Sequence, residues 1–504
     1  MNPELVFSNV TFEYPGATEA MFEALSLRFS QGWTGIVGAN GGGKTTLLHL
    51  AAGLLKPEIG TVRCVGHCDL CGQTDDEPPA AAEAFFSSYD TEAYRVREAF
   101  GVDEEMLERW DTLSFGERRR LTLAATVFEG PDILCLDEPT NHLDPEARDR
   151  LIKGLRLFTG IGLVVSHDRV LLDALCTQCL FVGNGTAILR PGRYDVGRAQ
   201  AEREQTLALD TLTRSQDLLR KAKGELQRRR VALQNVEAQD TKRAVSKNDH
   251  DARNYINSKR NTDSTGGFAA AAGAQARRVS RLAKDIATMD RPESRKLGLA
   301  FPLAFRAKSN TLLTVPAQQL SLGGERQLTL PEIILCPEDR IALTGPNGAG
   351  KSSLLRLLLP KITLPAEQVL YLPQALDAKA RAEMRETLDR LPREAFAHVM
   401  NVVATLGSEP GRVSAAADWS PGEARKLFLG LATLRPVALM ILDEPTNHLD
   451  LPAVENLEEA LNEAECALLV ISHDAPFLKR VCPKRWELSL EGTFRAVDYS
   501  FNNE

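Results

Sequence analysis

The nine residues LDEPTNHLD occur twice in this chain of 504 residues, at 136–144 and at 442–450. Two shorter segments repeat in the same order: GANGGGKT at 38–45 with GPNGAGKS at 345–352, and VSHD at 165–168 with ISHD at 471–474. Corresponding residues are 306 or 307 positions apart throughout. A repeat in register over three motifs predicts two related domains.

Each copy reads as strands alternating with helices. Apolar runs such as TGIVG and DILCLDE end where glycine-rich or acidic residues begin. Continuous apolar runs of this length are typical of buried parallel strands, and ligands bind beyond the carboxyl ends of such strands. We therefore expect an α/β fold in both copies, with the polar motifs gathered at one edge of each sheet.

Size and composition exclude several other classes. A chain of 504 residues with 43% apolar and 25% charged residues is too long for one core and has ordinary globular composition. It has no run of about 18 uncharged apolar residues, and the N-terminal MNPELVFSNV does not resemble a targeting signal. We expect a soluble cytoplasmic protein whose nine cysteines are thiols.

The segments at 38–45 and 345–352 match the phosphate-binding pattern GxxxxGK[ST]. Glycines let backbone N–H groups surround phosphates, the lysine reaches the terminal phosphates, and the following hydroxyl can bind Mg²⁺. Two copies at strand-to-helix junctions predict two ATP sites. The expected nucleotide-binding residues are Gly38, Asn40, Gly41, Gly43, Lys44, Thr45 and Thr46, and Gly345, Asn347, Gly348, Gly350, Lys351, Ser352 and Ser353.

Each LDEPTNHLD segment carries two adjacent carboxylates at the end of an apolar strand. Asp137 and Asp443 suit Mg²⁺, together with Thr45 and Ser352, whereas Glu138 and Glu444 suit the orientation and deprotonation of an attacking water. A solvated strand end is the alternative for such a pair, and its position after a phosphate loop favours catalysis.

His167 and His473 also follow apolar strands, so each can direct an imidazole at the γ-phosphate and water. We assign both to catalysis, since a buried structural histidine is less consistent with the repeat. Gln73 in CGQT and Gln374 in YLPQ lie at strand ends, where an amide can contact Mg²⁺ or water.

The order of phosphate loop, glutamine, LSFGE or WSPGE, and LDEPTNHLD resembles the ATP-binding cassette superfamily. The likeness implies two cassettes stacked head to tail, each ATP lying between the phosphate loop of one and the signature of the other. It assigns Ser114, Gly116 and Glu117 to the site of Lys351, and Ser420, Gly422 and Glu423 to the site of Lys44.

Three details of this likeness concern single residues. Phe115 and Pro421 replace the third-position glycine of LSGGQ, and proline has no N–H to offer a phosphate at the Lys44 site. Glutamate replaces the final glutamine in both signatures. Tyr14 matches the aromatic residue that stacks on adenine, the alternative being a buried strand aromatic.

The segment between the cassettes has a different charge. Residues 198–296 contain 22 Lys and Arg against 13 Asp and Glu, whereas the whole chain has a net charge of −8. Leu212, Leu219, Leu226 and Leu233 recur every seven residues, and Val279, Leu282, Ile286 and Met289 have helical spacing. These patterns predict an antiparallel helical hairpin whose first arm, at about 198–238, is on the order of 60 Å long.

We expect the first cassette at 1–192, the basic hairpin at 193–300 and the second cassette at 301–504. A solvated coiled coil that only joins the cassettes is one interpretation of the hairpin. The other is RNA binding through Arg228, Arg229, Arg230, Arg253, Lys259 and Arg260, with Tyr255 and Phe268 stacking near the tip.

Two cassettes in one chain, no membrane segment and an interdomain hairpin together resemble the ABC-F family, which acts on ribosomes. The likeness implies an ATPase that uses ATP and Mg²⁺, whose cassettes pair within a monomer and whose linker contacts rRNA or tRNA at the ribosome, in antibiotic resistance or ordinary translation. Only about 40 residues separate Gln73 from Ser114, so the helical arm that several members insert there is missing.

Two other functions compete with this interpretation. A tandem ATPase subunit of an ABC transporter would have no use for the basic hairpin, and a DNA-repair ATPase would carry convincing zinc modules. Cys64, His67, Cys68 and Cys71 form CxxHCxxC, with a further CxxC at Cys176 and Cys179. Strand alternation would place Cys68 opposite His67 and Cys71, so we interpret these cysteines as thiols.

Overall fold

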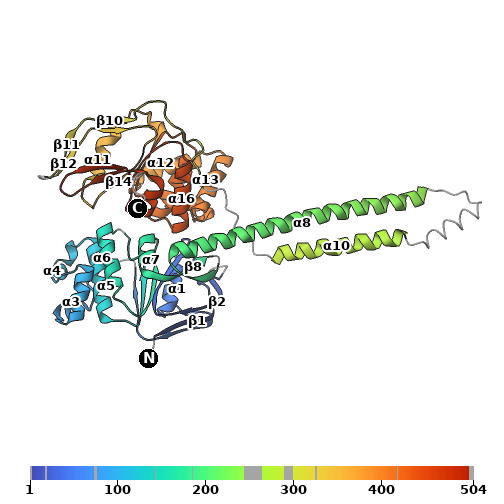
Figure 1. The fold of residues 1–504 in the computed structure, drawn as a ribbon, viewed down its shortest axis with the longest axis horizontal. Helices are drawn as coiled ribbons and strands as arrows, with labels where there is room; N and C mark the ends of the chain where they lie inside the picture. Colours follow the sequence, from blue (N-terminus) through green and yellow to red (C-terminus); the bar gives the residue numbers. More distant parts are fainter. Residues whose placement is uncertain are drawn as a thin grey trace, which may run out of the picture. The chain divides into compact units, whose positions relative to one another are not determined.

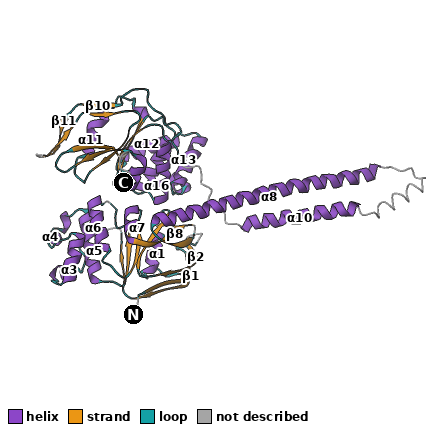
Figure 2. Cartoon of the chain, in the orientation of Figure 1, coloured by secondary structure: helices purple, strands orange, loops and turns teal. Residues whose placement is uncertain are grey.

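The computed structural model describes residues 3–16, 20–72, 77–141, 143–183, 185–242, 264–288, 299–323, 326–416 and 418–498. The chain forms two compact units, one of Met1–Gly197 with Lys296–Glu504 and one of Arg198–Arg295. The first holds both copies of the repeat as mixed sheets and helices, and the described part of the second is helical (Figure 2). The predicted α/β fold with a helical linker is confirmed.

A six-stranded sheet forms the centre of the first cassette, in the order β5-β6-β7-β3-β8-β9. Its neighbouring strands are parallel except for β8 and β9. The strands are β3 (Gly32–Gly38), β5 (Cys68–Cys71), β6 (Ile133–Asp137), β7 (Ile161–Val165), β8 (Cys176–Gly183) and β9 (Thr186–Pro191). An antiparallel sheet, β2-β1-β4, is made of β1 (Glu4–Phe12), β2 (Phe22–Phe29) and β4 (Ile59–Val65).

Every residue of β6 and β7 is buried, because both faces of this sheet are covered. Ile133 and Cys135 pack with α1 and the antiparallel sheet, whereas Leu134 and Leu136 pack into a second cluster with the helices of the opposite face. This two-sided burial explains the continuous apolar runs. The helices are α1 (Lys44–Ala51), α2 (Ala82–Ser87), α3 (Thr91–Phe100), α4 (Glu105–Glu108), η1 (Trp110–Thr112), α5 (Phe115–Glu129), α6 (Pro145–Leu155) and α7 (Arg169–Leu175).

The second cassette repeats this plan around a sheet in the order β15-β16-β17-β14-β18-β19. Its strands are β14 (Arg340–Thr344), β15 (Val369–Leu372), β16 (Leu439–Asp443), β17 (Ala467–Ile471), β18 (Lys484–Leu488) and β19 (Phe494–Asp498). Two antiparallel pairs accompany it: β10 (Leu313–Val315) with β13 (Ile333–Leu335), and β11 (Gln318–Gly323) with β12 (Arg326–Leu330). The helices are α11 (Lys351–Leu358), η2 (Leu359–Lys361), η3 (Ala366–Gln368), α12 (Ala378–Asp389), α13 (Arg393–Thr405), α14 (Pro410–Ala415), α15 (Pro421–Ala432), α16 (Leu451–Glu463) and α17 (Ala475–Val481).

The parallel strands bring the repeated motifs to one edge of each sheet. In the first cassette β3 ends at Gly38, β6 at Asp137 and β7 at Val165, the first residues of the phosphate loop, the acidic pair and the histidine motif. The phosphate loop leads into helix α1, which is labelled in Figure 1. The second cassette has the same arrangement. The carboxyl ends of parallel strands meet at one edge, so residues far apart in the chain become neighbours there.

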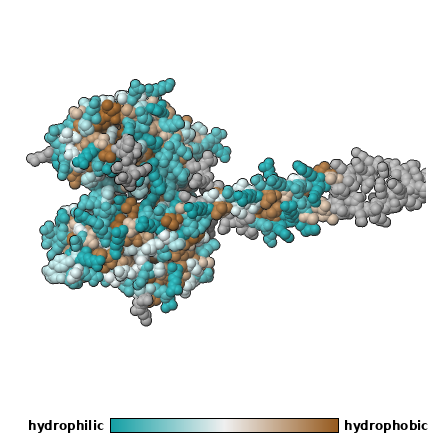
Figure 3. Space-filling model, viewed as in Figure 1, coloured by the Kyte–Doolittle hydropathy of each residue, from teal (hydrophilic) through white to brown (hydrophobic). Residues whose placement is uncertain are grey.

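The described residues of the linker unit belong to α8 (Tyr194–Lys242), which begins just before the unit, and to α10 (Ser264–Thr288). The two helices run antiparallel, since Arg229 donates to the carbonyl of Ala271 at 3.2 Å while Gln275 donates to the carbonyl of Ala222 at 3.3 Å. Polar residues cover most of their described surface in Figure 3. The predicted helical hairpin is confirmed in this part of the chain. The tip residues Arg253, Tyr255, Lys259 and Arg260 lie outside the described residues, as does the side chain of Phe268.

Across the described ranges, the helices include none that is long and apolar enough to cross a membrane.

Candidate functional site

Close backbone approaches require glycine in both phosphate loops. A Cβ on Gly38 would lie 2.0 Å from the carbonyl oxygen of Val182, and φ at Gly38 is +155°. Gly345 is similarly constrained, since a Cβ there would lie 2.5 Å from the carbonyl oxygen of Leu488. The loops therefore lie directly against strands β8 and β18. This fit holds their remaining backbone N–H groups at the start of a helix, where anions bind.

The lysine of each loop bends back over the loop itself. Lys44 Nζ donates to the carbonyls of Gly38 at 2.9 Å and Ala39 at 3.0 Å, and Lys351 Nζ donates to that of Gly345 at 2.6 Å. Burial lowers the pKa of both lysines, and the nearby carboxylates, which raise the pKa, offset only part of this effect. A bound polyphosphate would supply the negative charge that such buried amines need.

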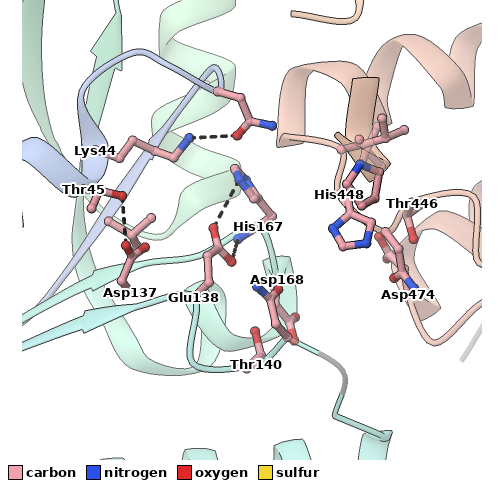
Figure 4. A pocket seen from close by; sticks show the side chains of 18 of the residues that line it. Lys44, Thr45, Asp137, Glu138, Thr140, His167, Asp168, Thr446, His448 and Asp474 are labelled. Carbon is pink, nitrogen blue, oxygen red and sulfur yellow. Dashed lines mark hydrogen bonds and ion pairs between the residues drawn. The ribbon is translucent and has the colours of Figure 1, made fainter. Parts of the chain in front are cut away.

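The first acidic pair already contacts the phosphate loop. Thr45 Oγ1 donates to Asp137 Oδ2 at 2.8 Å (Figure 4). The other oxygen of this carboxylate, Oδ1, is buried and has no hydrogen-bond partner among the described residues. Ser352 and Asp443 line one pocket together with Lys351. Mg²⁺ prefers oxygen ligands, so a carboxylate oxygen without a hydrogen-bond partner beside a hydroxyl group suits this ion.

The glutamate of each pair lies against the histidine of the same cassette. His167 Nε2 is 3.2 Å from Glu138 Oε1, and the His167 backbone N–H donates to Oε2 at 3.3 Å (Figure 4). In the second cassette His473 Nε2 is 3.5 Å from Glu444 Oε1, and the corresponding backbone bond is 3.4 Å.

Both glutamates are held in an uncommon backbone conformation, with φ of +50° at Glu138 and at Glu444. A glutamate there is strained, and such strain is typical of functional positions. The same value in both copies shows that the fold imposes this conformation at the end of each acidic strand.

Burial controls the protonation of this cluster. It raises the pKa of Glu138 to about 8 and that of Glu444 to about 7. It also lowers the pKa of His167 to about 3 and that of His473 to about 4. Each site thus combines a neutral imidazole with a carboxyl group that titrates near neutral pH. A carboxylate tuned in this way is suited to accept a proton from water.

The two signature motifs form the N-termini of α5 and α15 with the same capping box. Ser114 accepts from the backbone N–H of Glu117 at 3.3 Å, and the Glu117 carboxylate accepts from the Ser114 hydroxyl at 2.7 Å. Ser420 and Glu423 repeat both bonds at the same distances. The signature glutamates therefore shape the loop that carries the serine.

The cassettes face each other across their nucleotide sites. A pocket of about 650 Å³ is lined by Lys44, Glu138 and His167 of the first cassette and by Ser420 and Gly422 of the second. A pocket of about 360 Å³ brings Asn347 of the second cassette to the first signature, lined by Ser114, Gly116 and Glu117. Glu423 is not among the residues that line the first pocket.

The remaining predicted residues occupy different positions. Gln374 lines the pocket of Lys351 and Asp443, whereas Gln73 lies outside the described residues. The Tyr14 hydroxyl is 2.9 Å from Thr46 Oγ1 and its side chain is 40% exposed. An exposed ring beside the phosphate loop is accessible to a base, so adenine stacking stays a prediction.

The other predicted loop residues lie where the two motifs place them. Asn40, Gly41, Gly43, Thr45 and Thr46 line the large pocket. Gly348, Gly350, Ser352 and Ser353 line the pocket of Lys351. In the described part of the chain, no group of three or more His, Cys, Asp or Glu side chains is arranged to hold a metal ion, the cysteine motif included.

Two kinds of residue were missed in the sequence. Arg119 and Arg425, buried in the signature helices, donate to the backbone carbonyls of Asp137 and Glu444 respectively. Asp450, the last residue of the second LDEPTNHLD, accepts from the backbone N–H of Asn40 in the opposite cassette at 2.7 Å. The sequence did contain one signal, since each of these residues has an identical counterpart 306 positions away. Their positions in the motifs do not by themselves suggest a role at the site.

Comparisons with known proteins agree with this arrangement. A family model described as ABC transporter matches residues 22–141 and 332–447. The ribosome protection protein VmlR of Bacillus subtilis is 29% identical over 98% of this chain and 88% of its own. The tylosin resistance ATP-binding protein TlrC of Streptomyces fradiae is 30% identical over 96% and 97%.

A solved structure has the same fold. The complex of an archaeal ribosomal stalk protein with the archaeal ribosome recycling factor aABCE1 matches with a TM-score of 0.61, at 18% identity, over 97% of this chain and 89% of that one.

The fold and the two facing sites define a tandem-cassette ATPase, an enzyme that binds and hydrolyses ATP. Similarity along the linker as well as both cassettes is more specific, because it spans nearly the whole of the chain and of its relatives. The chain belongs to the ABC-F family.

Proposed function

We propose that this ATPase acts on the ribosome, where ATP-driven closure of the cassettes repositions the basic linker near tRNA or rRNA. The observation that carries the proposal is the match to a ribosome protection protein over 98% of the chain, linker included. The excess of 22 basic over 13 acidic residues at 198–296 supports it, because the linker is the one strongly basic segment of an acidic chain. A transporter subunit would not require such a linker.

At each site the two cassettes would share one ATP. Lys44 and Lys351 would bind the terminal phosphates, with the loop N–H groups around them and the opposite signature serine, Ser420 or Ser114, closing the site. Thr45, Asp137 and Gln73, or Ser352, Asp443 and Gln374, would hold Mg²⁺. When bound, Mg²⁺ supplies positive charge to the phosphate oxygens.

Hydrolysis needs a base and a positioned water. In our proposal the ionised carboxylate of Glu138 or Glu444 takes a proton from water as the water oxygen bonds to the γ-phosphorus. The bond from that phosphorus to the bridging oxygen breaks, leaving ADP and inorganic phosphate. The neutral imidazole of His167 or His473 orients the γ-phosphate. Because both sites carry all of these groups, we propose that both hydrolyse ATP.

The test uses Glu138→Gln with Glu444→Gln, which keeps the shape of both side chains but removes the base. With ATP and Mg²⁺ the double variant should stay closed and sediment with ribosomes in a sucrose gradient. If it sediments only as free protein, the ribosomal proposal is wrong, while loss of ATP hydrolysis without loss of ATP binding would still support the base assignment.

A second comparison tests the linker. Arg228→Gln with Arg230→Gln, introduced into the double glutamine variant, should reduce the ribosome-bound fraction and weaken its dependence on salt. The matched control replaces two exposed cassette arginines, Arg63 and Arg306, which are 71% and 65% exposed. Equal losses from both pairs would mean that the linker charge has no special role.

A further inference from the structure

Helix α16 of the second cassette and its N-cap residue place three acidic side chains against the first cassette. Asp450, its N-cap, accepts from the backbone N–H of Asn40 at 2.7 Å. Glu455 accepts from the Tyr194 hydroxyl at 3.0 Å, and Glu458 forms an ion pair with Arg169 at 2.8 Å. One helix thus connects the Lys44 phosphate loop, the histidine motif and the first residue of the linker helix.

The ion pair between Arg169 and Glu458 is buried on both sides. The two side chains are 6% and 4% exposed. Arg480 of the second cassette binds the other Glu458 oxygen at 2.7 Å, but its side chain is 58% exposed. Two charges removed from water are costly unless they remain paired, so separation of the cassettes at this point would leave Glu458 with one exposed partner.

The Arg169–Glu458 pair is not duplicated by the repeat. At the spacing of 306 residues that relates Asp137 to Asp443, the counterpart of Arg169 is Ala475 and that of Glu458 is Ile152. Neither can form an ion pair, so the equivalent position on the other side of the interface has no matching bond. The asymmetry therefore comes from the sequence and is not a consequence of the duplicated fold.

Both members of the pair are associated with the Lys44 site. Arg169 follows His167 by two residues, at the start of α7, and Glu458 lies two turns after Asp450 on α16. The pair holds the segment after His167 against the helix whose first residue binds the phosphate loop. Displacement of α16 would change both contacts together, because a helix moves as a rigid element.

We propose that Arg169 and Glu458 are positioning residues that seat the second cassette on the Lys44 site, and that Glu455 carries the position of α16 to Tyr194 at the base of the linker. The first part concerns the Lys44 ATP site alone and does not depend on the ribosome. The second part rests on the proposed function, since it gives the route by which closure reaches the linker.

The test follows hydrogen–deuterium exchange of the Glu138→Gln, Glu444→Gln protein during an ATP titration, without ribosomes. The peptides of interest cover 38–45, 345–352 and 190–197. Arg169→Met should raise the ATP concentration that half-protects 38–45 by at least about tenfold, since one partner of a buried interfacial pair is lost. Protection of 345–352 should shift by less than about twofold.

Arg480→Met is the matched control, because it removes the partner of Glu458 that lies within the second cassette and is exposed. It should shift neither loop by more than about twofold. Arg169→Lys keeps the charge and should restore most of the protection of 38–45. Tyr194→Phe should leave both loops unchanged and abolish the ATP-dependent protection of 190–197.

The positioning role would be overturned if Arg169→Met shifted the half-protecting ATP concentration equally for 38–45 and 345–352. It would also be overturned if Arg480→Met shifted that of 38–45 as much as Arg169→Met does. If Arg169→Met unfolds the protein in thermal denaturation, Glu458→Gln provides the second test, since it keeps the shape of the side chain and removes its charge. If the ATP-dependent protection of 190–197 is the same in Tyr194→Phe as in the parent protein, the proposed route to the linker is wrong. Because no ribosome is present, none of these results depends on the ribosome sedimentation experiment.

Discussion

The pH dependence of hydrolysis should differ between the two ATP sites. Single substitutions leave one base each: Glu444→Gln leaves Glu138, and Glu138→Gln leaves Glu444. The remaining carboxyl must be ionised to take a proton from water, and burial raises the pKa to about 8 for Glu138 and to about 7 for Glu444. Activity should therefore rise with pH at both sites. The rise should occur at higher pH for the site that uses Glu138 than for the site that uses Glu444.

The expected size of the difference follows from these two pKa values. Between about pH 6.5 and about pH 8.5 the ionised fraction of Glu138 increases from about 3% to about 76%, or about 25-fold. That of Glu444 increases from about 24% to about 97%, or about fourfold. His167 and His473, with pKa values of about 3 and about 4, stay neutral throughout and add no step.

The assay is the release of phosphate at low ATP concentration, because kcat/KM reports the ionisation of the free enzyme. Thermal denaturation at each pH checks that the protein stays folded. A flat profile in the Glu444→Gln protein, or a steeper one in the Glu138→Gln protein, would refute the assignment of these pKa values to the bases. Inactivity of both single variants would contradict independent hydrolysis at the two sites.

Two further substitutions test the phosphate loop and the signature. Pro421→Gly should supply a missing N–H and lower the ATP concentration needed at the Lys44 site by up to about tenfold, measured by ATP titration, whereas Phe115→Gly, at a position that already has this N–H, should change binding little. Gly38→Ala should destabilise the protein by about 3 kcal/mol in denaturant unfolding, since its Cβ would meet the Val182 carbonyl at 2.0 Å, whereas Gly41→Ala, with open space around it, should cost only about 1 kcal/mol. Similar values for the two alanines would show that the close approach is unimportant.

The two cassettes, the helical linker and the edge of each sheet where the motifs meet could be predicted from the amino-acid sequence. The phosphate loops and the LDEPTNHLD segments allow this prediction because each lies at the end of a buried parallel strand, and the carboxyl ends of such strands lie at one edge of the sheet. The basic charge and heptad spacing of the linker indicated its helices for a similarly local reason. Burial of β6 and β7 on both faces likewise follows from their continuous apolar residues.

The residues that meet across the cassettes, and the strength with which they hold their protons, depend on the packing of the folded chain. Arg169 and Glu458 are 289 residues apart, and no local pattern relates an arginine after SHD to one glutamate of an acidic helix. The pKa values of Glu138 and His167 depend on how completely the surrounding side chains remove water, which no motif records. Identical nine-residue segments thus provide two bases with different pKa values, because their surroundings differ.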